Sequence, residues 1–289
     1  MSKIVFVSED DVPFPQLLMM FDTSWFKVLT FLGFWSIIWF PVAFGISKAM
    51  NLQADRPLIP KQKIILLASL YLLSPIVLAW KIRLENFSLA DLGLVLQSEL
   101  FVSTLSGIII GLLSLIIVFA LESIFNLVVW HWENTKELLS LILPVFLLSL
   151  FVSLIEELVF RGYIFTTLAK DYSYWIAAMM SSLIFALLHL IWERKETLPQ
   201  IPGLWLMGII LVGARIVDNN SLGLAIGLHA SWIWGLTCID SAGLLTYNKP
   251  NSWLTGLNQQ PLAGVAGISC LVITGLVLWS VSGSNLLVY

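Results

Sequence analysis

Eight long apolar runs, separated by short polar segments, dominate the sequence. They cover residues 28–47, 64–80, 100–121, 138–160, 174–192, 204–217, 222–239 and 262–281. A helix needs about 20 residues to cross about 30 Å of hydrocarbon, and the runs lack the alternation of barrel strands. Because only helices and closed barrels satisfy their backbone in lipid, the pattern predicts an all-α fold, a polytopic membrane helix bundle of about eight transmembrane helices.

The polar positions predict how the chain is organised. Residues 1–27 carry four acidic side chains and two prolines, and no cationic region precedes a cleavable apolar stretch, so we expect a polar or interfacial lead-in and not a secretory signal. Residues 28–289 are expected to form a single transmembrane bundle. The first three spans and the last carry no charge and are expected to face lipid, whereas spans four to seven carry polar residues and are expected to lie inside.

Composition supports a membrane protein. The chain is 58% hydrophobic and 11% charged, with a mean hydropathy of +0.92, whereas soluble domains carry about 25% charged residues. The partners expected on this ground are membrane lipids, with aromatic belts formed by the 17 Phe and 13 Trp residues. A net charge of −3 gives no indication of nucleic acid binding. Cys238 and Cys270 lie in apolar runs and are expected to behave as small apolar groups.

The fourth span contains an unusual group of charges. Glu156 and Glu157 follow an apolar run, and Arg161 lies four residues after the second glutamate. A carboxylate in or beside hydrocarbon is costly and is usually functional. Glu157 and Arg161 are expected to pair along one helix face, which leaves Glu156, about 100° around the helix, available for chemistry. The alternative is a charge cluster at the helix end, level with the lipid headgroups, with Arg161 extending to the interface.

Two of the three histidines lie in apolar spans. His189 lies near the end of the fifth span and follows Phe185 by one helical turn, and His229 lies in the seventh span. His131, in a polar loop, is expected to be interfacial. Two intramembrane histidines in a chain that also has an intramembrane glutamate pair indicate a buried polar site. Arg215, near the end of the sixth span, is expected to be structural.

These motifs resemble those of a known family. Glu156-Glu157-x-x-x-Arg161, then Phe185-x-x-x-His189, then His229 are similar in order and placement to the three motifs of the CPBP family, the type II CAAX prenyl endopeptidases and their bacteriocin-processing and immunity relatives. The resemblance covers about residues 138–245. It implies a glutamate-dependent intramembrane endopeptidase that acts on a membrane-associated peptide or protein substrate.

The resemblance also implies roles for the residues. Glu156 would activate water as a base, His189 would bind and polarise that water, and His229 would stabilise the oxyanion. Glu157 and Arg161 would order the site. Peptide hydrolysis needs an activated water, a proton donor for the leaving amine and donors aimed at the developing negative charge.

One position departs from the family pattern. The family usually has Asn four residues after the last histidine, whereas this chain has Ile233 in the segment His229-Ala-Ser-Trp-Ile. Isoleucine cannot donate a hydrogen bond, and loss of one oxyanion donor typically slows an enzyme by about 10²–10³-fold. We expect activity to survive, because the base and both histidines are present.

Several alternatives stay open. A non-catalytic membrane scaffold or immunity protein of the same fold would tolerate Ile233, and a transporter would use Glu156 and the histidines as a proton relay, although no inverted repeat supports it. We expect no cofactor. A divalent metal is an alternative, because a glutamate with two histidines is a zinc-like ligand set, but no HExxH is present. The tryptophan-rich segment after His229 suggests a multi-pass protein of a bacterial cell membrane, and nothing indicates an oligomeric state.

Overall fold

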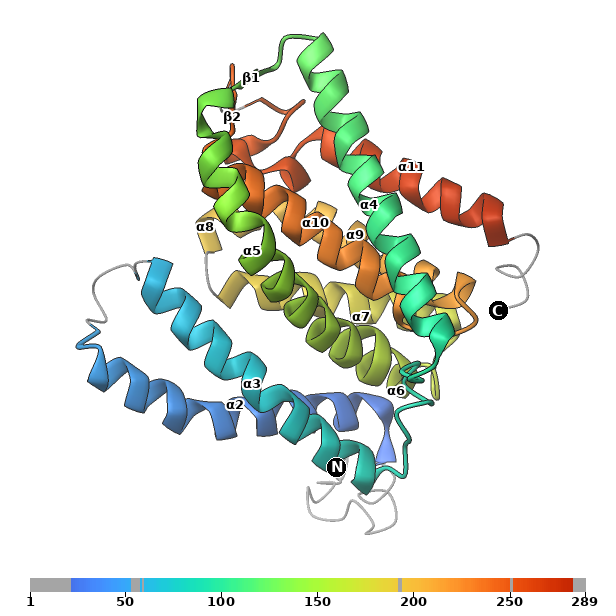
Figure 1. Cartoon of the computed structure of the whole chain (residues 1–289). Coiled ribbons are helices and arrows are strands. Elements are labelled where there is room, and N and C mark those ends of the chain that lie inside the picture. The colour runs from blue at the N-terminus through green and yellow to red at the C-terminus, as the bar shows by residue number, and fades with distance from the viewer. Residues whose placement is uncertain (1–21, 53–57, 59, 192–193, 250–251, 283–289) are drawn as a thin grey trace, which may run out of the picture.

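The computed structural model describes residues 22–52, 58, 60–191, 194–249 and 252–282, and Figure 1 shows its helical architecture. The long helices are α2 (Ser24–Ala49), α3 (Pro60–Leu84), α4 (Ser98–Ile124), α5 (Thr135–Glu156), α7 (Tyr174–Leu188), α9 (Ile201–Val217), α10 (Gly223–Ser241) and α11 (Val265–Ser282). The shorter elements are β1 (Val128–Trp130), η1 (Trp132–Asn134), η2 (Glu157–Ile164), α6 (Phe165–Leu168), η3 (His189–Ile191), α8 (Arg194–Thr197), η4 (Leu198–Gln200), β2 (Leu245–Tyr247), η5 (Leu257–Gln259) and η6 (Pro261–Ala263).

Each predicted apolar run contains one long helix, and the predicted all-α membrane bundle is confirmed. Within the described residues, six helical stretches are long and apolar enough to cross a membrane, and Val265–Ser280 is apolar but shorter. Most of the predicted lead-in, residues 1–21, lies outside the described part of the chain, and α2 begins at Ser24, shortly before the predicted first span. Trp192, predicted to end the fifth span, also lies outside it.

One feature was not predicted. Strands β1 and β2 form a two-stranded antiparallel ribbon, with Val128 opposite Tyr247 and Trp130 opposite Leu245. Strands of three residues are too short for hydrophobic alternation to reveal them in the sequence.

Helices α9 and α10 lie deepest in the fold, as expected for polar spans. The buried residues of α10 run continuously from Gly223 to Trp232. Its backbone lies directly against α4, because a Cβ at Gly227 would be 2.0 Å from the Thr104 carbonyl oxygen and one at Gly107 would be 2.4 Å from that of Leu224. Glycines on both helices allow this close approach, because small residues let the backbones of membrane helices come together. The contact sets the position of α10 along α4.

Helices α2 and α3 pack mainly against each other, and we call them the N-terminal helix pair. The remaining helices, α4 to α11, form what we call the core bundle (Figure 1). Within the pair, the indole N–H groups of Trp35 and Trp39 donate to the Leu70 carbonyl oxygen at 3.2 Å and to Ser69 Oγ at 2.9 Å.

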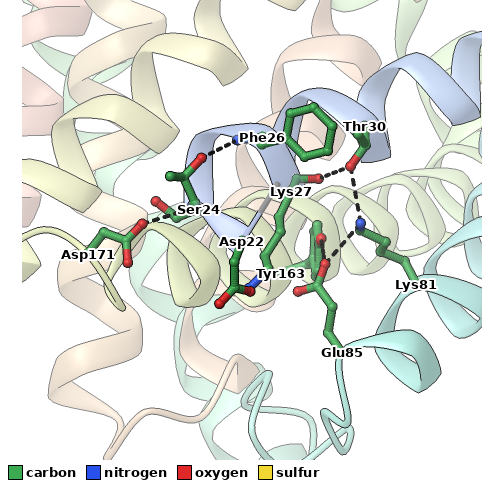
Figure 2. A network of polar contacts seen from close by, with 10 residues as sticks. Asp22, Ser24, Phe26, Lys27, Thr30, Lys81, Glu85, Tyr163 and Asp171 are labelled. Carbon is green, nitrogen blue, oxygen red and sulfur yellow. Dashed lines mark hydrogen bonds and ion pairs between the residues drawn. The ribbon is translucent and has the colours of Figure 1, made fainter. Parts of the chain in front are cut away.

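A polar network attaches the N-terminal helix pair to the core bundle (Figure 2). Lys81 forms an ion pair with Glu85 at 3.0 Å and donates to Thr30 Oγ1 at 3.2 Å. Tyr163, from the core bundle, donates to Glu85 at 2.8 Å. These contacts fix one end of the N-terminal helix pair over the helix that carries the two glutamates.

Candidate active site

The helix that carries the glutamates changes form at the site. Helix α5 continues through η2, a π-helical segment, into α6. Wide π turns are rare in proteins, and those that do occur are often found at functional sites. Two carbonyl oxygens in these turns accept bonds from neighbouring helices, Phe160 O from Ser181 Oγ at 2.7 Å and Arg161 O from Arg215. Buried backbone acceptors therefore keep partners where the helix is irregular.

Arg215 has the structural role expected of it. Besides Arg161 O, its guanidinium donates to Thr166 Oγ1 at 2.9 Å and to the carbonyl oxygens of Asn220 at 3.2 Å and Asp91 at 3.1 Å. It thus connects α6, α9 and two loops behind the glutamates.

Glu157 is completely buried and accepts two bonds on one oxygen. Arg161, also 0% exposed, donates to Glu157 Oε1 at 2.9 Å, so the predicted ion pair is confirmed. His229 Nδ1 lies 2.7 Å from the same oxygen. Because a carboxylate only accepts, the proton must be on Nδ1, which leaves Nε2 of a neutral ring as an acceptor. Glu157 therefore orients the imidazole of His229.

Glu156 lies beside this pair and contacts different partners. Its Oε2 is 3.5 Å from His229 Nε2. Its Oε1 accepts a hydrogen bond from the hydroxyl of Tyr71, on α3 of the N-terminal helix pair. Sequence reasoning missed Tyr71, since a single tyrosine in an apolar run carries no motif. The available signal was a phenolic hydroxyl at mid-span, in a segment that also contains Ser69 and Ser74.

His189 and Phe185 form the third part of the site. His189 Nδ1 is 2.8 Å from the Phe185 carbonyl oxygen, which places the proton on Nδ1 and the free lone pair on Nε2. The Phe185 ring contacts both histidines edge-on, with centroids 4.5 Å from His189 and 5.9 Å from His229. The Arg161 guanidinium lies 4.3 Å from the centre of the same ring. Phe185 thus packs the histidines and the buried arginine together.

A cavity of about 550 Å³ opens onto these groups. Glu156, His189 and His229 line it, and the predicted site residues Glu157 and Arg161 lie behind its wall. Ile233 lines it as well, so the position that departs from the family pattern faces the site. The N-terminal helix pair supplies one wall, and most of the remaining lining is apolar, including Trp35, Leu67, Val152, Met207, Trp232 and Leu236.

The geometry of the described residues gives no support to the metal alternative. Within the described residues, no group of three or more His, Cys, Asp or Glu side chains is arranged to hold a metal ion. Glu157 Oε1 already accepts from an arginine and a histidine, and Glu156 Oε1 accepts from Tyr71. The chemistry that this arrangement can support is proton transfer between Glu156, water and the two imidazoles in an apolar cavity.

Comparison with known proteins agrees with the motifs. Residues 138–235 match one family model, named Rce1-like and described as type II CAAX prenyl endopeptidase Rce1-like. The matched region runs from α5 to α10 and contains both glutamates, Arg161 and both histidines of the site. It does not include α3 or Tyr71. No curated protein and no solved structure matches the chain.

Proposed function

We propose that this integral membrane protein is an endopeptidase, because residues 138–235 match the Rce1-like family model, in agreement with the resemblance to CPBP proteins. It would hydrolyse a peptide bond of a membrane-associated protein or peptide with water activated by Glu156. One observation carries the proposal: Glu156, His189 and His229 come from three different helices and line a single cavity.

The first step would be attack by water. His189 Nε2, the free acceptor, would hold one proton of the water, and Glu156 Oε2 would take the other as the oxygen attacks the peptide carbonyl carbon. General base catalysis of this kind typically contributes about 10²–10⁴-fold. The apolar lining would strengthen these interactions by excluding bulk water.

The second step would be collapse of the tetrahedral intermediate. His229 would take up a proton from solvent water at Nε2 before the attack. Its Nε2–H would then donate to the oxyanion and would stay on the ring when the intermediate collapses. The Glu157 carboxylate, 2.7 Å from Nδ1, would stabilise the imidazolium form. The carbon–nitrogen bond then breaks as Glu156 returns its proton to the leaving nitrogen, which regenerates the carboxylate. Arg161 would keep Glu157 in place through the 2.9 Å ion pair.

A second function remains, and Ile233 favours it. An apolar side chain lines the cavity where the family usually has a hydrogen-bond donor. A non-catalytic scaffold or immunity protein would keep the fold and its buried polar site without needing that donor. Two statements stay predictions: that the protein resides in a bacterial cell membrane, and that its substrate is a membrane-associated peptide or protein.

The test is proteolysis by the purified full chain in liposomes, against a panel of membrane-tethered peptides. Cleavage by the intact protein and its loss in Glu156→Gln, which keeps the shape of the side chain, would support the proposal. Glu122→Gln is the matched control, because Glu122 is a buried glutamate of α4 that does not line the cavity. Equal cleavage by Glu156→Gln, or no cleavage by the folded intact protein, would contradict it. Loss of cleavage with a chelator would instead support the metal alternative.

A further inference from the structure

Tyr71 connects two parts of the molecule that the sequence motifs do not link. It lies on α3, 85 residues from Glu156, and outside the region that matches the Rce1-like family. Its hydroxyl nevertheless donates to Glu156 Oε1, and both residues line the same cavity. The N-terminal helix pair therefore contributes a polar group to the site as well as an apolar wall.

The two oxygens of Glu156 have different partners. Oε1 accepts from Tyr71, and Oε2 is 3.5 Å from His229 Nε2. A terminal carboxylate torsion is broad when nothing restrains it. A donor on Oε1 restricts that rotation and keeps Oε2 directed toward the cavity and His229. A proton transferred to Glu156 would then be taken up at Oε2.

We propose that Tyr71 is a positioning residue for Glu156, and that α3 is therefore part of the active site. The hydroxyl keeps its own proton throughout and acts only through the carboxylate that it restrains. The catalytic consequence rests on the proposed function, whereas the restraint itself does not. Because one helix of the N-terminal helix pair supplies this donor, the Rce1-like region alone would lack a fully ordered base.

The competing explanation is that Tyr71 only attaches α3 to the core bundle. Tyr163 provides the matched comparison, because its hydroxyl also donates to a carboxylate at 2.8 Å across the same interface, that of Glu85, which directly follows α3. Tyr163 does not line the cavity. Tyr163→Phe and Tyr71→Phe therefore remove the same group from the same interface, and only the second change affects Glu156.

Kinetics of the full chain form the first measurement. We expect Tyr71→Phe to lower kcat by about 10- to 100-fold, the size expected for a hydrogen bond to a charged group, with KM unchanged. Tyr163→Phe should leave both constants unchanged. Equal kcat in Tyr71→Phe and the intact protein, or equal losses in the two variants, would overturn the positioning role.

Infrared difference spectroscopy forms the second measurement and needs no substrate. Subtracting the spectrum of Glu156→Gln isolates the carboxyl stretching bands of Glu156. These bands should shift in Tyr71→Phe and not in Tyr163→Phe. A shift in a protein that cleaves no peptide would refute the proposed protease function and still support the contact, whereas unchanged bands would overturn the contact itself.

A chemical variant covers the case in which Tyr71→Phe does not fold. 3-Fluorotyrosine at position 71 keeps the ring and makes the hydroxyl a stronger donor. The Glu156 bands should then move in the direction that a stronger hydrogen bond requires. Bands that coincide with those of the unlabelled protein would overturn the proposal.

Discussion

Helix α9 of the core bundle and helix α2 of the N-terminal helix pair differ sharply in burial. In the most apolar window of the stretch Arg194–Val217, 56% of residues are buried, compared with 6% in Ser24–Ala49. The core bundle contains its own buried ion pair and close helix contacts. The N-terminal helix pair joins it through buried apolar side chains such as Phe31 and Val77, and through polar contacts such as Glu85 with Tyr163. The residues proposed for the chemistry thus lie in the core bundle, and one wall of the cavity comes from the N-terminal helix pair.

This difference suggests that stability and activity can be changed separately. Changes in the core bundle should affect folding most strongly. Changes at the cavity surface should affect turnover with little effect on folding. Changes at polar contacts of the N-terminal helix pair that lie away from the cavity should affect only local order. The three predictions that follow test this order of effects.

The largest effect is expected from breaking the buried ion pair. Arg161→Met leaves the buried Glu157 with His229 as a hydrogen-bond partner but without its cationic partner. Loss of one member of a buried ion pair typically costs about 3–5 kcal/mol. Both side chains are 0% exposed, so water cannot replace the lost contact. Equilibrium unfolding in mixed micelles measures the change.

The control for that prediction removes both charges. Glu157→Leu with Arg161→Met leaves no unpaired charge, so the double variant should be more stable than Arg161→Met alone. It should still lose cleavage, because His229 loses the acceptor that orients it. A single variant as stable as the intact protein would refute the importance of the pair.

An intermediate effect is expected from adding a donor to the cavity. Ile233→Asn places an amide one helical turn from His229, where it can donate to the oxyanion. One such donor is typically worth about 10²–10³-fold in rate, and we expect kcat to rise by at least about tenfold. Leu236→Asn, at another cavity position of the same helix, is the control and should give no gain. Unchanged kcat in Ile233→Asn would show that the site does not use a donor there.

The smallest effect is expected at the start of α2. The Ser24 N–H donates to Asp171 at 2.7 Å and holds the pKa of that carboxyl below its ordinary value (Figure 2). A lowered folded-state pKa stabilises the contact above about pH 4, the unfolded value, and the stabilisation is lost as pH falls through the folded-state value. Because the carboxyl is exposed, the effect should be small.

Hydrogen exchange at Ser24, corrected for the intrinsic rate, measures this effect. Protection should fall at acidic pH in the intact protein while protection in α10 stays constant. Asp171→Asn should lower protection at neutral pH and remove the pH dependence. Equal pH dependence in the intact protein and Asp171→Asn would assign the effect to another group.

Much of the fold and part of the site could be predicted. The long helices followed from the apolar runs, because length and hydropathy are local properties. The Glu157–Arg161 pair followed from spacing along a helix, and His189 and His229 were found through motifs. The π-helical form of η2 was not predictable, because Leu158, Val159 and Phe160 are equally compatible with an α-helix.

The sequence by itself determined that this is a membrane helix bundle, because a chain with so few charged residues cannot cover a soluble surface. It also determined which residues could carry chemistry, because ionisable groups are costly in hydrocarbon. Only the tertiary structure decided that Tyr71 donates to Glu156, and that Glu157 is shared by Arg161 and His229. The contacts of Tyr71 with Glu156 and of His229 with Glu157 join residues on different helices. Helix packing, which no local pattern encodes, determines which of these atoms come within bonding distance.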